Sequence, residues 1–196
     1  IDKQNLRKLF SVLDTSLHKY PSYKKNKKTL QKTNFEVGDT IKDFKLQLEN
    51  NTIQFQKIAE NNFVYIDFWN PENEPSISSQ STVSGAFTWS IKNNTNWKFI
   101  SICLDADSSK WMKKSNELGI NWYNAIDTNP EKSIFSSFYN TEHLPCGVLI
   151  NPDGIVVKNN IMSTDDRSEA FKLLYLNPQK NTTLTAKPQN IVSEKK

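Results

Sequence analysis

The residues of this chain that could do chemistry gather in one short stretch, between Asp67 and Ser76. The acidic Asp67 lies inside an apolar run, and an amide, a proline and a hydroxyl follow it at Asn73, Pro75 and Ser76. An amide has no nucleophilic electron pair at neutral pH, and a serine hydroxyl needs a nearby base before it can attack. Nucleophilic catalysis is therefore not expected at this stretch.

A second group of reactive side chains lies late in the chain, at His143 and Cys146. Cys146 follows Pro145 directly and begins an apolar run, and free cysteines are among the most often buried residues. A one-cysteine thiol-disulfide oxidoreductase or redox sensor that uses Cys146 stays open as the alternative function. His143 and Cys146 could offer imidazole and thiolate to a soft metal. Two ligands make a weak site, so the sequence predicts no metal and no cofactor.

The elements that must position these residues can be read from the run at 63–69. Aromatic and β-branched residues fill this run, which is typical of a central strand, and a helix is expected to follow it. Asn73 is a good helix N-cap, and Pro75 is tolerated in the first turn because its missing N–H would have no helical partner there. Glu72 and Glu74 add negative charge near the positive end of the helix dipole. These residues predict a stable helix start.

The remaining periodic segments alternate between strands and helices. The helix after the turn is expected to bury Ile77, Val83, Phe87 and Ile91, although its serines and threonines weaken it. A tight Asn-Pro-Asp-Gly turn is expected to join two late strands. The order is that of an α/β fold, a mixed central sheet with helices on both faces. The expected strands are 44–48, 53–55, 97–105, 144–150 and 155–157. The other expected helices are 108–118, one that begins at 129–131 with Ile134, Phe135 and Phe138 on its apolar face, and 167–176.

Three landmarks resemble the TlpA-like branch of the thioredoxin superfamily. They are the Asp-Phe-Trp run at 67–69, Pro145 at the opening of a late strand, and Leu-Ile-Asn-Pro-Asp-Gly at 149–154. In that family, Asp-Phe-Trp and three further residues lead into Cys-x-Pro-Cys. Asn73 and Ser76 stand at the two cysteine positions here, so the resemblance implies a site without its reactive thiols.

The resemblance covers residues 35–176 and implies the fold and the roles of several residues. The fold would be a thioredoxin-like three-layer sandwich with an N-terminal β-hairpin and an additional N-terminal helix. Asp67 matches a buried family carboxylate that assists proton transfer, and burial is expected to raise its pKa. Pro145 matches the family's cis-proline, whose loop contacts substrate peptides. The family's sheet order places Cys103 and Cys146 about 9–10 Å apart, so both are expected to be free thiols.

Two sets of site residues follow from the resemblance. The first is a vestigial active site, which comprises Asp67, Asn73, Ser76, Pro145 and Cys146. The second is a groove inherited for gripping extended peptides or protein partners. Its expected residues are Trp69, Asn70, Glu72, Asn73, Ser76, His143, Leu144 and Pro145.

The chain is expected to form one domain with two extensions. Residues 1–33 combine an amphipathic helix at 5–20 with a Lys-rich linker, 34–177 form the domain, and 178–196 are a polar, disordered tail. The net charge of +4 is local, because residues 1–33 hold nine Lys and Arg against two Asp, while the rest holds sixteen basic and nineteen acidic residues. An evenly charged body argues against a nucleic-acid partner.

Residues and resemblance together predict a redox-inactive protein- or peptide-binding or structural module, and not an enzyme. No run of about 18 apolar residues occurs, so no transmembrane segment is expected. A signal peptide or lipid anchor ahead of Ile1 is compatible with the chain. The N-terminal extension resembles the segment ahead of TlpA-like domains in Bacteroidetes envelope proteins. We therefore expect a subunit of a bacterial cell-envelope complex, located in the periplasm or attached to the envelope.

Overall fold

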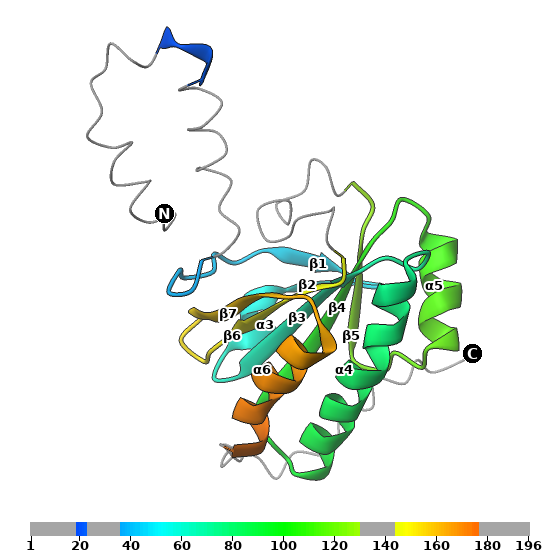
Figure 1. Cartoon of the computed structure of the whole chain (residues 1–196). Helices are drawn as coiled ribbons and strands as arrows, with labels where there is room; N and C mark the ends of the chain where they lie inside the picture. The colour runs from blue at the N-terminus through cyan, green and yellow to red at the C-terminus, as the bar shows by residue number, and fades with distance from the viewer. Residues whose placement is uncertain (1–18, 23–35, 130–143, 177–196) are drawn as a thin grey trace. The chain divides into compact units, whose positions relative to one another are not determined.

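The structure is a computed structural model, and it describes residues 19–22, 36–129 and 144–176 (Figure 1). The chain forms two compact units, Ile1–Asn34 and Phe35–Lys196. The predicted N-terminal helix, the Lys-rich linker and the polar tail fall almost wholly outside the described residues, so this division of the chain stays a prediction. The second unit holds the sheet and the candidate site.

The second unit is built on a five-stranded mixed sheet (Figure 1). Its central strand, β3 (Phe63–Trp69), pairs parallel to β4 (Trp97–Leu104) and antiparallel to β6 (Cys146–Ile150). On the outside, β5 (Tyr123–Asp127) runs parallel to β4, and β7 (Val156–Ile161) runs antiparallel to β6. The order is β5-β4-β3-β6-β7. The predicted mixed sheet is confirmed, with β3 at its centre because both of its edges are paired.

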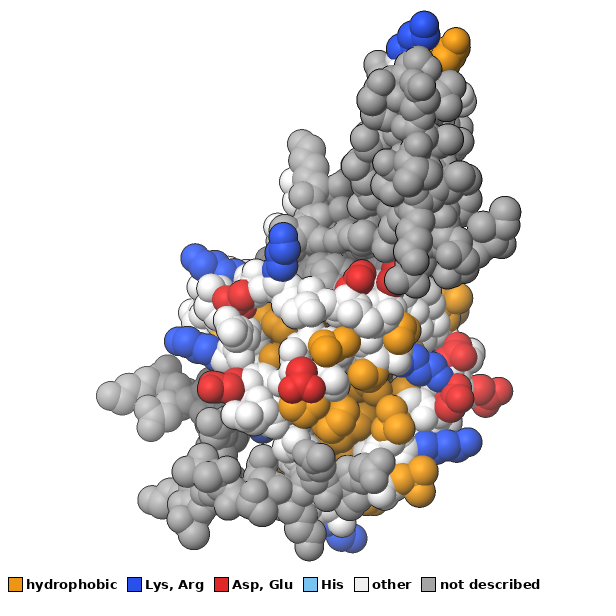
Figure 2. Space-filling model, turned by 90° about the vertical axis from the view of Figure 1, so that its left-hand side faces the viewer, with side chains coloured by type: hydrophobic (Ala, Val, Ile, Leu, Met, Phe, Trp, Pro, Cys, Tyr) orange, Lys and Arg blue, Asp and Glu red, His pale blue; other side chains and the backbone are white. Residues whose placement is uncertain are grey.

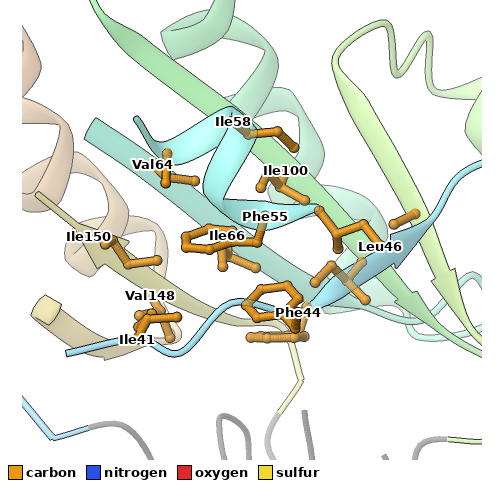
Figure 3. Packing of buried hydrophobic residues seen from close by; sticks show 14 of the residues in the cluster. Ile41, Phe44, Leu46, Phe55, Ile58, Val64, Ile66, Ile100, Val148 and Ile150 are labelled. Carbon is orange, nitrogen blue, oxygen red and sulfur yellow. The ribbon is translucent and has the colours of Figure 1, made fainter. Parts of the chain in front are cut away.

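One face of the sheet is covered by the predicted N-terminal hairpin. Strands β1 (Lys45–Gln47) and β2 (Thr52–Gln54) pair antiparallel, and a short helix, α3 (Phe55–Ala59), follows directly. Figure 3 shows how Phe44 and Phe55, whose rings stack with centroids 4.6 Å apart, lie over the apolar side chains of the sheet. This face of β3 carries alternate residues, because successive strand side chains point to opposite sides. The sheet residues of this cluster include Val64, Ile66, Phe68, Ile100, Val148 and Ile150.

The other face of the sheet packs against three long helices of the described residues. They are α4 (Glu74–Lys92), α5 (Ser108–Glu117) and α6 (Thr164–Leu176). Tyr65 of β3 lies in a cluster with residues of α4 and α6, including Phe171, whose ring centroid is 4.9 Å away. Asp67 lies two positions after Tyr65 on the strand, so it faces these helices too. This face of the sheet therefore holds the polar residues of the candidate site.

The buried side of α4 differs from the expectation. Val83 is buried, but Ile91 is 66% exposed, and much of the side that faces the sheet is polar. The reason is that the sheet presents a carboxyl group, Asp67, where a glutamine can donate a hydrogen bond to it. Ile91 lies in the last turn of the helix, next to the buried Ser90, and its side chain is exposed. The buried residues of α4 are Ser76, Ser79, Gln80, Val83, Ala86 and Ser90.

The β7 edge of the sheet is partly covered by the chain that leads into β1. Thr40 forms an isolated antiparallel bridge with Ile155, and the Ile41 N–H donates to the Gly154 carbonyl.

Figure 2 shows the left-hand side of Figure 1, where hydrophobic side chains gather and charged ones lie around them. No helix among the described residues is long and apolar enough to cross a membrane.

Candidate functional site

The candidate site begins where β3 ends and α4 starts. Asn73 is the N-cap of α4, as predicted, and its side-chain oxygen accepts a hydrogen bond of 2.9 Å from the Ser76 N–H. Its backbone is extended, with φ −99° and ψ 108°, which suits an N-cap. Pro75 lies in the first turn, where its missing N–H leaves no helical partner unpaired. Glu74 adds negative charge to the same turn.

Asn70 holds this turn in place against the neighbouring strand. Its Nδ2 donates to the Leu104 carbonyl at 2.9 Å, and its Oδ1 accepts from the Glu72 N–H at 2.8 Å. Glu72 in turn reaches α5, where its carboxylate pairs with the Lys110 Nζ at 2.5 Å. The hydrogen bond and the charge of Glu72 raise the pKa of Lys110. The turn is thus tied to β4 and to α5 by polar contacts.

Three of the predicted groove residues are buried, which corrects the expected groove at these positions. Trp69 is fully buried and packs with Cys103, Trp111 and Ile126, because α5 covers the end of β3. Ser76 is also fully buried, and Pro145 is buried. A side chain with no exposed surface cannot line a groove. The groove residues that keep some exposure are Asn70, Glu72, Asn73 and Leu144, and His143 lies outside the described residues.

The late strand β6 brings its first residues beside the central strand. The peptide bond between Leu144 and Pro145 is cis, and Cys146 pairs with Phe68 in the sheet. Cys146 is 1% exposed, and burial together with the nearby Asp67 charge raises the pKa of its thiol to about 12. Burial also raises the pKa of Cys103, which is fully buried. Both cysteines are free thiols, as predicted, and neither favours the reactive thiolate form.

Asp67 lies at the centre of a buried polar network. Its Oδ1 accepts from the Arg167 Nη2 at 3.1 Å and from the Tyr65 hydroxyl at 3.3 Å, and its Oδ2 accepts from the Gln80 Nε2 at 2.7 Å. Asp67 is fully buried, and Arg167 is 1% exposed. Burial raises the pKa of Asp67, while the Arg167 guanidinium and the hydrogen bonds oppose this effect. The network joins β3 to α4 and α6.

The residues around the network leave room for its side chains and hold them in place. Gly147 pairs with Asp67 across the sheet, and a Cβ atom there would lie 2.4 Å from the Tyr65 hydroxyl oxygen. Only glycine leaves room for that hydroxyl. Arg167 is held from its other side, since its Nη1 donates to the Met162 carbonyl at 2.8 Å and to the Ser163 carbonyl at 3.3 Å. The guanidinium therefore has one position.

Residues 60–156 match the family model described as thioredoxin-like. This chain carries a thioredoxin-like domain.

Solved structures with the same fold include those of several bacterial thiol-disulfide proteins. A protein of Chlorobium tepidum assigned as the thiol:disulfide interchange protein DsbE is 20% identical, with a TM-score of 0.62, and the match covers 73% of this chain and 99% of that chain. The thioredoxin domain of a Bacteroides vulgatus thiol-disulfide oxidoreductase is 16% identical, with a TM-score of 0.61 and coverages of 72% and 99%. A secreted Mycobacterium tuberculosis disulfide oxidoreductase is 16% identical, with a TM-score of 0.56 and coverages of 68% and 96%. Among curated proteins, none matches the sequence significantly.

Sequence reasoning missed three residues of the thioredoxin-like domain that build the network, namely Tyr65, Gln80 and Arg167. A signal for Arg167 is present, because Ala170, Phe171 and Leu174 follow it at the spacing of one helix face and all three are buried. An arginine at the start of an apolar face needs a buried partner. Nothing in the local pattern names Asp67 as that partner.

The described part of the thioredoxin-like domain holds no group of three or more His, Cys, Asp or Glu side chains that could bind a metal ion. The pairing of His143 with Cys146 lies beyond the described residues, because His143 does. The chemistry available at the described site is thus that of hydrogen-bonding amides, a buried ion pair and two protonated thiols.

Proposed function

We propose that this thioredoxin-like domain is redox-inactive and acts as a protein- or peptide-binding or structural module in a complex of the bacterial cell envelope. The observation that carries the proposal is the capping of α4 by Asn73. Its side-chain oxygen accepts the Ser76 N–H and caps α4, at the position where the family's attacking thiol stands. The helix start is complete without a reactive group.

The alternative, an oxidoreductase or redox sensor that uses Cys146, is disfavoured by the surroundings of this thiol. Attack on a disulfide requires a thiolate that the substrate can reach. Cys146 has 1% of its surface exposed, and its pKa is raised to about 12. At neutral pH a group with that pKa is almost wholly protonated.

The proposed binding surface is the exposed part of the turn before α4 together with Leu144. Glu72 is exposed, and Asn70, Asn73 and Leu144 are half-buried. Three of these four residues are polar, and Leu144 adds a hydrophobic side chain beside them. A protein or peptide partner could form hydrogen bonds with the polar groups and cover the leucine.

The proposed location is the periplasm or the cell envelope. Support comes from the structural neighbours, which include an interchange protein assigned as DsbE and a disulfide oxidoreductase that is secreted. Fractionation of the native host, with an antibody against this protein, tests the location. Recovery in the soluble cytoplasmic fraction alone would contradict it.

Redox inactivity is tested by the reduction of insulin with dithiothreitol as the electron donor. We expect the wild-type protein and the Cys146→Ser variant to add nothing to the rate with dithiothreitol alone. A thioredoxin with its two cysteines serves as the positive control. A wild-type rate above the background that the Cys146→Ser change abolishes would establish the alternative function.

The binding surface is tested by site-specific photo-crosslinking in the native host. A crosslinking residue is placed at Glu72, inside the proposed surface, and in a matched control at Glu60, which is also exposed but follows α3. We expect position 72 to yield a defined crosslinked partner that position 60 does not yield. Identical products at both positions, or none at position 72, would contradict the proposed surface.

A further inference from the structure

The buried carboxyl group of Asp67 lies where it could serve chemistry at the start of α4. Gln80, which donates to Asp67, lies four residues after Ser76 on the same buried side of the helix. Residues four apart on a helix are separated by slightly more than one turn, or about 6 Å along its axis. The Asp67 charge also acts on the Cys146 thiol across the sheet. A free carboxylate at this place could accept a proton from a thiol at position 76.

The structure shows that this carboxylate is not free. Its Oδ1 accepts from Arg167 and from Tyr65, and its Oδ2 accepts from Gln80. The Arg167 guanidinium stays charged at every pH at which proteins fold. Two backbone carbonyls, those of Met162 and Ser163, hold the guanidinium from its other side. Hydrogen bonds to both Asp67 and Arg167 therefore fix the geometry of the ion pair.

We propose that Arg167 is a positioning residue which holds Asp67 in an ion pair and thereby withholds its carboxylate from proton transfer at the first turn of α4. The proposal rests on the redox inactivity proposed above and deepens it. The domain would lack a usable proton acceptor as well as the two thiols. Cysteines introduced at positions 73 and 76 would then give only a poor oxidoreductase.

The test uses the full chain with the Asn73→Cys and Ser76→Cys substitutions as its background. In this dithiol background the two introduced thiols pass two electrons to a disulfide of insulin, are themselves oxidised to a disulfide, and are reduced again by dithiothreitol. The rate of insulin reduction is compared with and without a further change at Arg167. Arg167→Met removes the charge, and Arg167→Lys keeps it and serves as the matched control.

We expect Arg167→Met to raise the rate about tenfold or more, because general acid–base catalysis is worth at least that much. Arg167→Lys should leave the rate low. Adding Asp67→Asn to the Arg167→Met variant should remove the gain, since the gain depends on the released carboxylate. Absence of a gain in a folded Arg167→Met variant would overturn the proposal. A gain that persists with Asp67→Asn would overturn it as well, because loosening of α6 would then be its cause.

A second measurement decides the question if the variants at position 167 fail to fold. It is the pH dependence, between pH 6 and 9, of the alkylation rate of the two introduced thiols in the dithiol background alone. The groups that face Asp67 are Tyr65 of β3, Gln80 of α4, Cys146 of β6 and Arg167 of α6. With Asp67 locked, we expect the profile to follow the titration of the introduced thiols only. An added inflection that Asp67→Asn removes would show a carboxyl group that exchanges protons, and would overturn the proposal.

The wild-type protein is measured in the same insulin assay. Activity of the wild type would refute the proposed redox inactivity without deciding the role of Arg167. The comparison of Arg167→Met with Arg167→Lys decides that role by itself. The two proposals can therefore fail separately.

Discussion

The Asn73 side-chain oxygen is used at the N-terminus of α4, where it accepts the hydrogen bond of the Ser76 N–H. The Ser76 hydroxyl is buried and has no hydrogen-bond partner among the described residues. In a protein with a cysteine at the first position, the thiolate would draw its stabilisation from the N–H groups and the dipole at this helix end. The amide takes that place and leaves nothing to attack a disulfide. Any thiol chemistry would have to come from Cys146 or Cys103.

Cys146 makes the stability of the domain depend on pH in the alkaline range. The unfolded thiol ionises near pH 8.5, while the folded one keeps its proton up to a pKa of about 12. The unfolded state therefore binds fewer protons between these values, so the free energy of unfolding must fall as pH rises through them. At pH 10 one such thiol costs about 2 kcal/mol relative to pH 8. We expect urea unfolding at pH 8 and pH 10 to show at least this loss, since burial also raises the pKa of Cys103, and Cys146→Ala to reduce the loss by about 2 kcal/mol.

The control for this prediction is Ser115→Ala, which changes a buried residue that does not titrate. It should leave the difference between pH 8 and pH 10 unchanged. A Cys146→Ala variant that loses as much stability as the wild type between the two pH values would show that the thiol ionises normally in the folded state.

Gly147 gives a prediction about packing around Tyr65. A methyl group at position 147 would meet the Tyr65 hydroxyl oxygen at 2.4 Å and its ring at 2.8 Å, inside a fully buried site. Overpacking of this kind costs about 1–3 kcal/mol. Gly147→Ala should lower the free energy of unfolding by that amount in urea titrations.

Gly85 offers the matched control. It lies in α4, is exposed, and has no heavy atom within 4 Å of the place where a Cβ would stand. Gly85→Ala should raise the free energy of unfolding by about 0.5–1 kcal/mol, because alanine favours a helix over glycine. Equal effects of the two substitutions would mean that the Tyr65 hydroxyl is not held against Gly147.

At the scale of the element, α4 depends on its first turn because its other residues are poor helix formers. Serines and threonines make up much of the helix, and Gly85 lies in its middle. Asn73→Ala removes the capping oxygen, so we expect the free energy of unfolding to fall by about 1 kcal/mol. Asn73→Asp keeps an oxygen and adds a charge that suits the helix dipole, so it should be as stable as the wild type.

The control for the cap is Asn116→Ala, an exposed change inside α5. Such a surface change should stay within about 0.5 kcal/mol of the wild type. A loss from Asn73→Ala no greater than that from Asn116→Ala would contradict the capping role. Circular dichroism during thermal unfolding gives both values.

The elements were predictable to the extent that their signals are local. The N-cap at Asn73 and the apolar strand at 63–69 can be recognised from a few neighbouring residues, and the structure has both. The buried side of α4 was not predictable in the same way. Gln80 is buried although it is polar, because Asp67, on a different element, accepts its hydrogen bond. Hydrophobic periodicity carries no information on such a polar pairing.

The same limit explains the error at Trp69. Placed at the end of a strand and next to the turn, it has the position of a residue that lines a surface groove. Whether its side chain is exposed depends on α5, which supplies Trp111 to the cluster that buries it. The length and packing of a helix that starts some forty residues later cannot be read from the strand. The topology could be inferred from the family resemblance, whereas the burial of Trp69 depends on tertiary contacts.

At the scale of the whole molecule, the Asp67–Arg167 pair joins segments that are one hundred residues apart in the sequence. It links the central strand to the last helix, and Gln80 links the same carboxyl group to α4. A buried pair of this kind contributes little net stability over well-packed apolar residues, but loss of one partner leaves an uncompensated charge. The pair therefore constrains where α6 can lie more than it stabilises the fold.

Breaking this pair from one side should be far more damaging than replacing both partners. We expect Asp67→Leu and Arg167→Met each to lower the free energy of unfolding by about 3–5 kcal/mol, since each leaves a buried charge without its partner. The double variant should lose much less than the sum of the two. Lys158→Met and Glu169→Gln form the control cycle on an ion pair with an exposed carboxylate, where the coupling should not exceed about 1 kcal/mol. Additive losses of stability from the Asp67 and Arg167 substitutions in urea unfolding would mean that the two groups do not act as a pair. The position of α6 would then be determined by its apolar face alone.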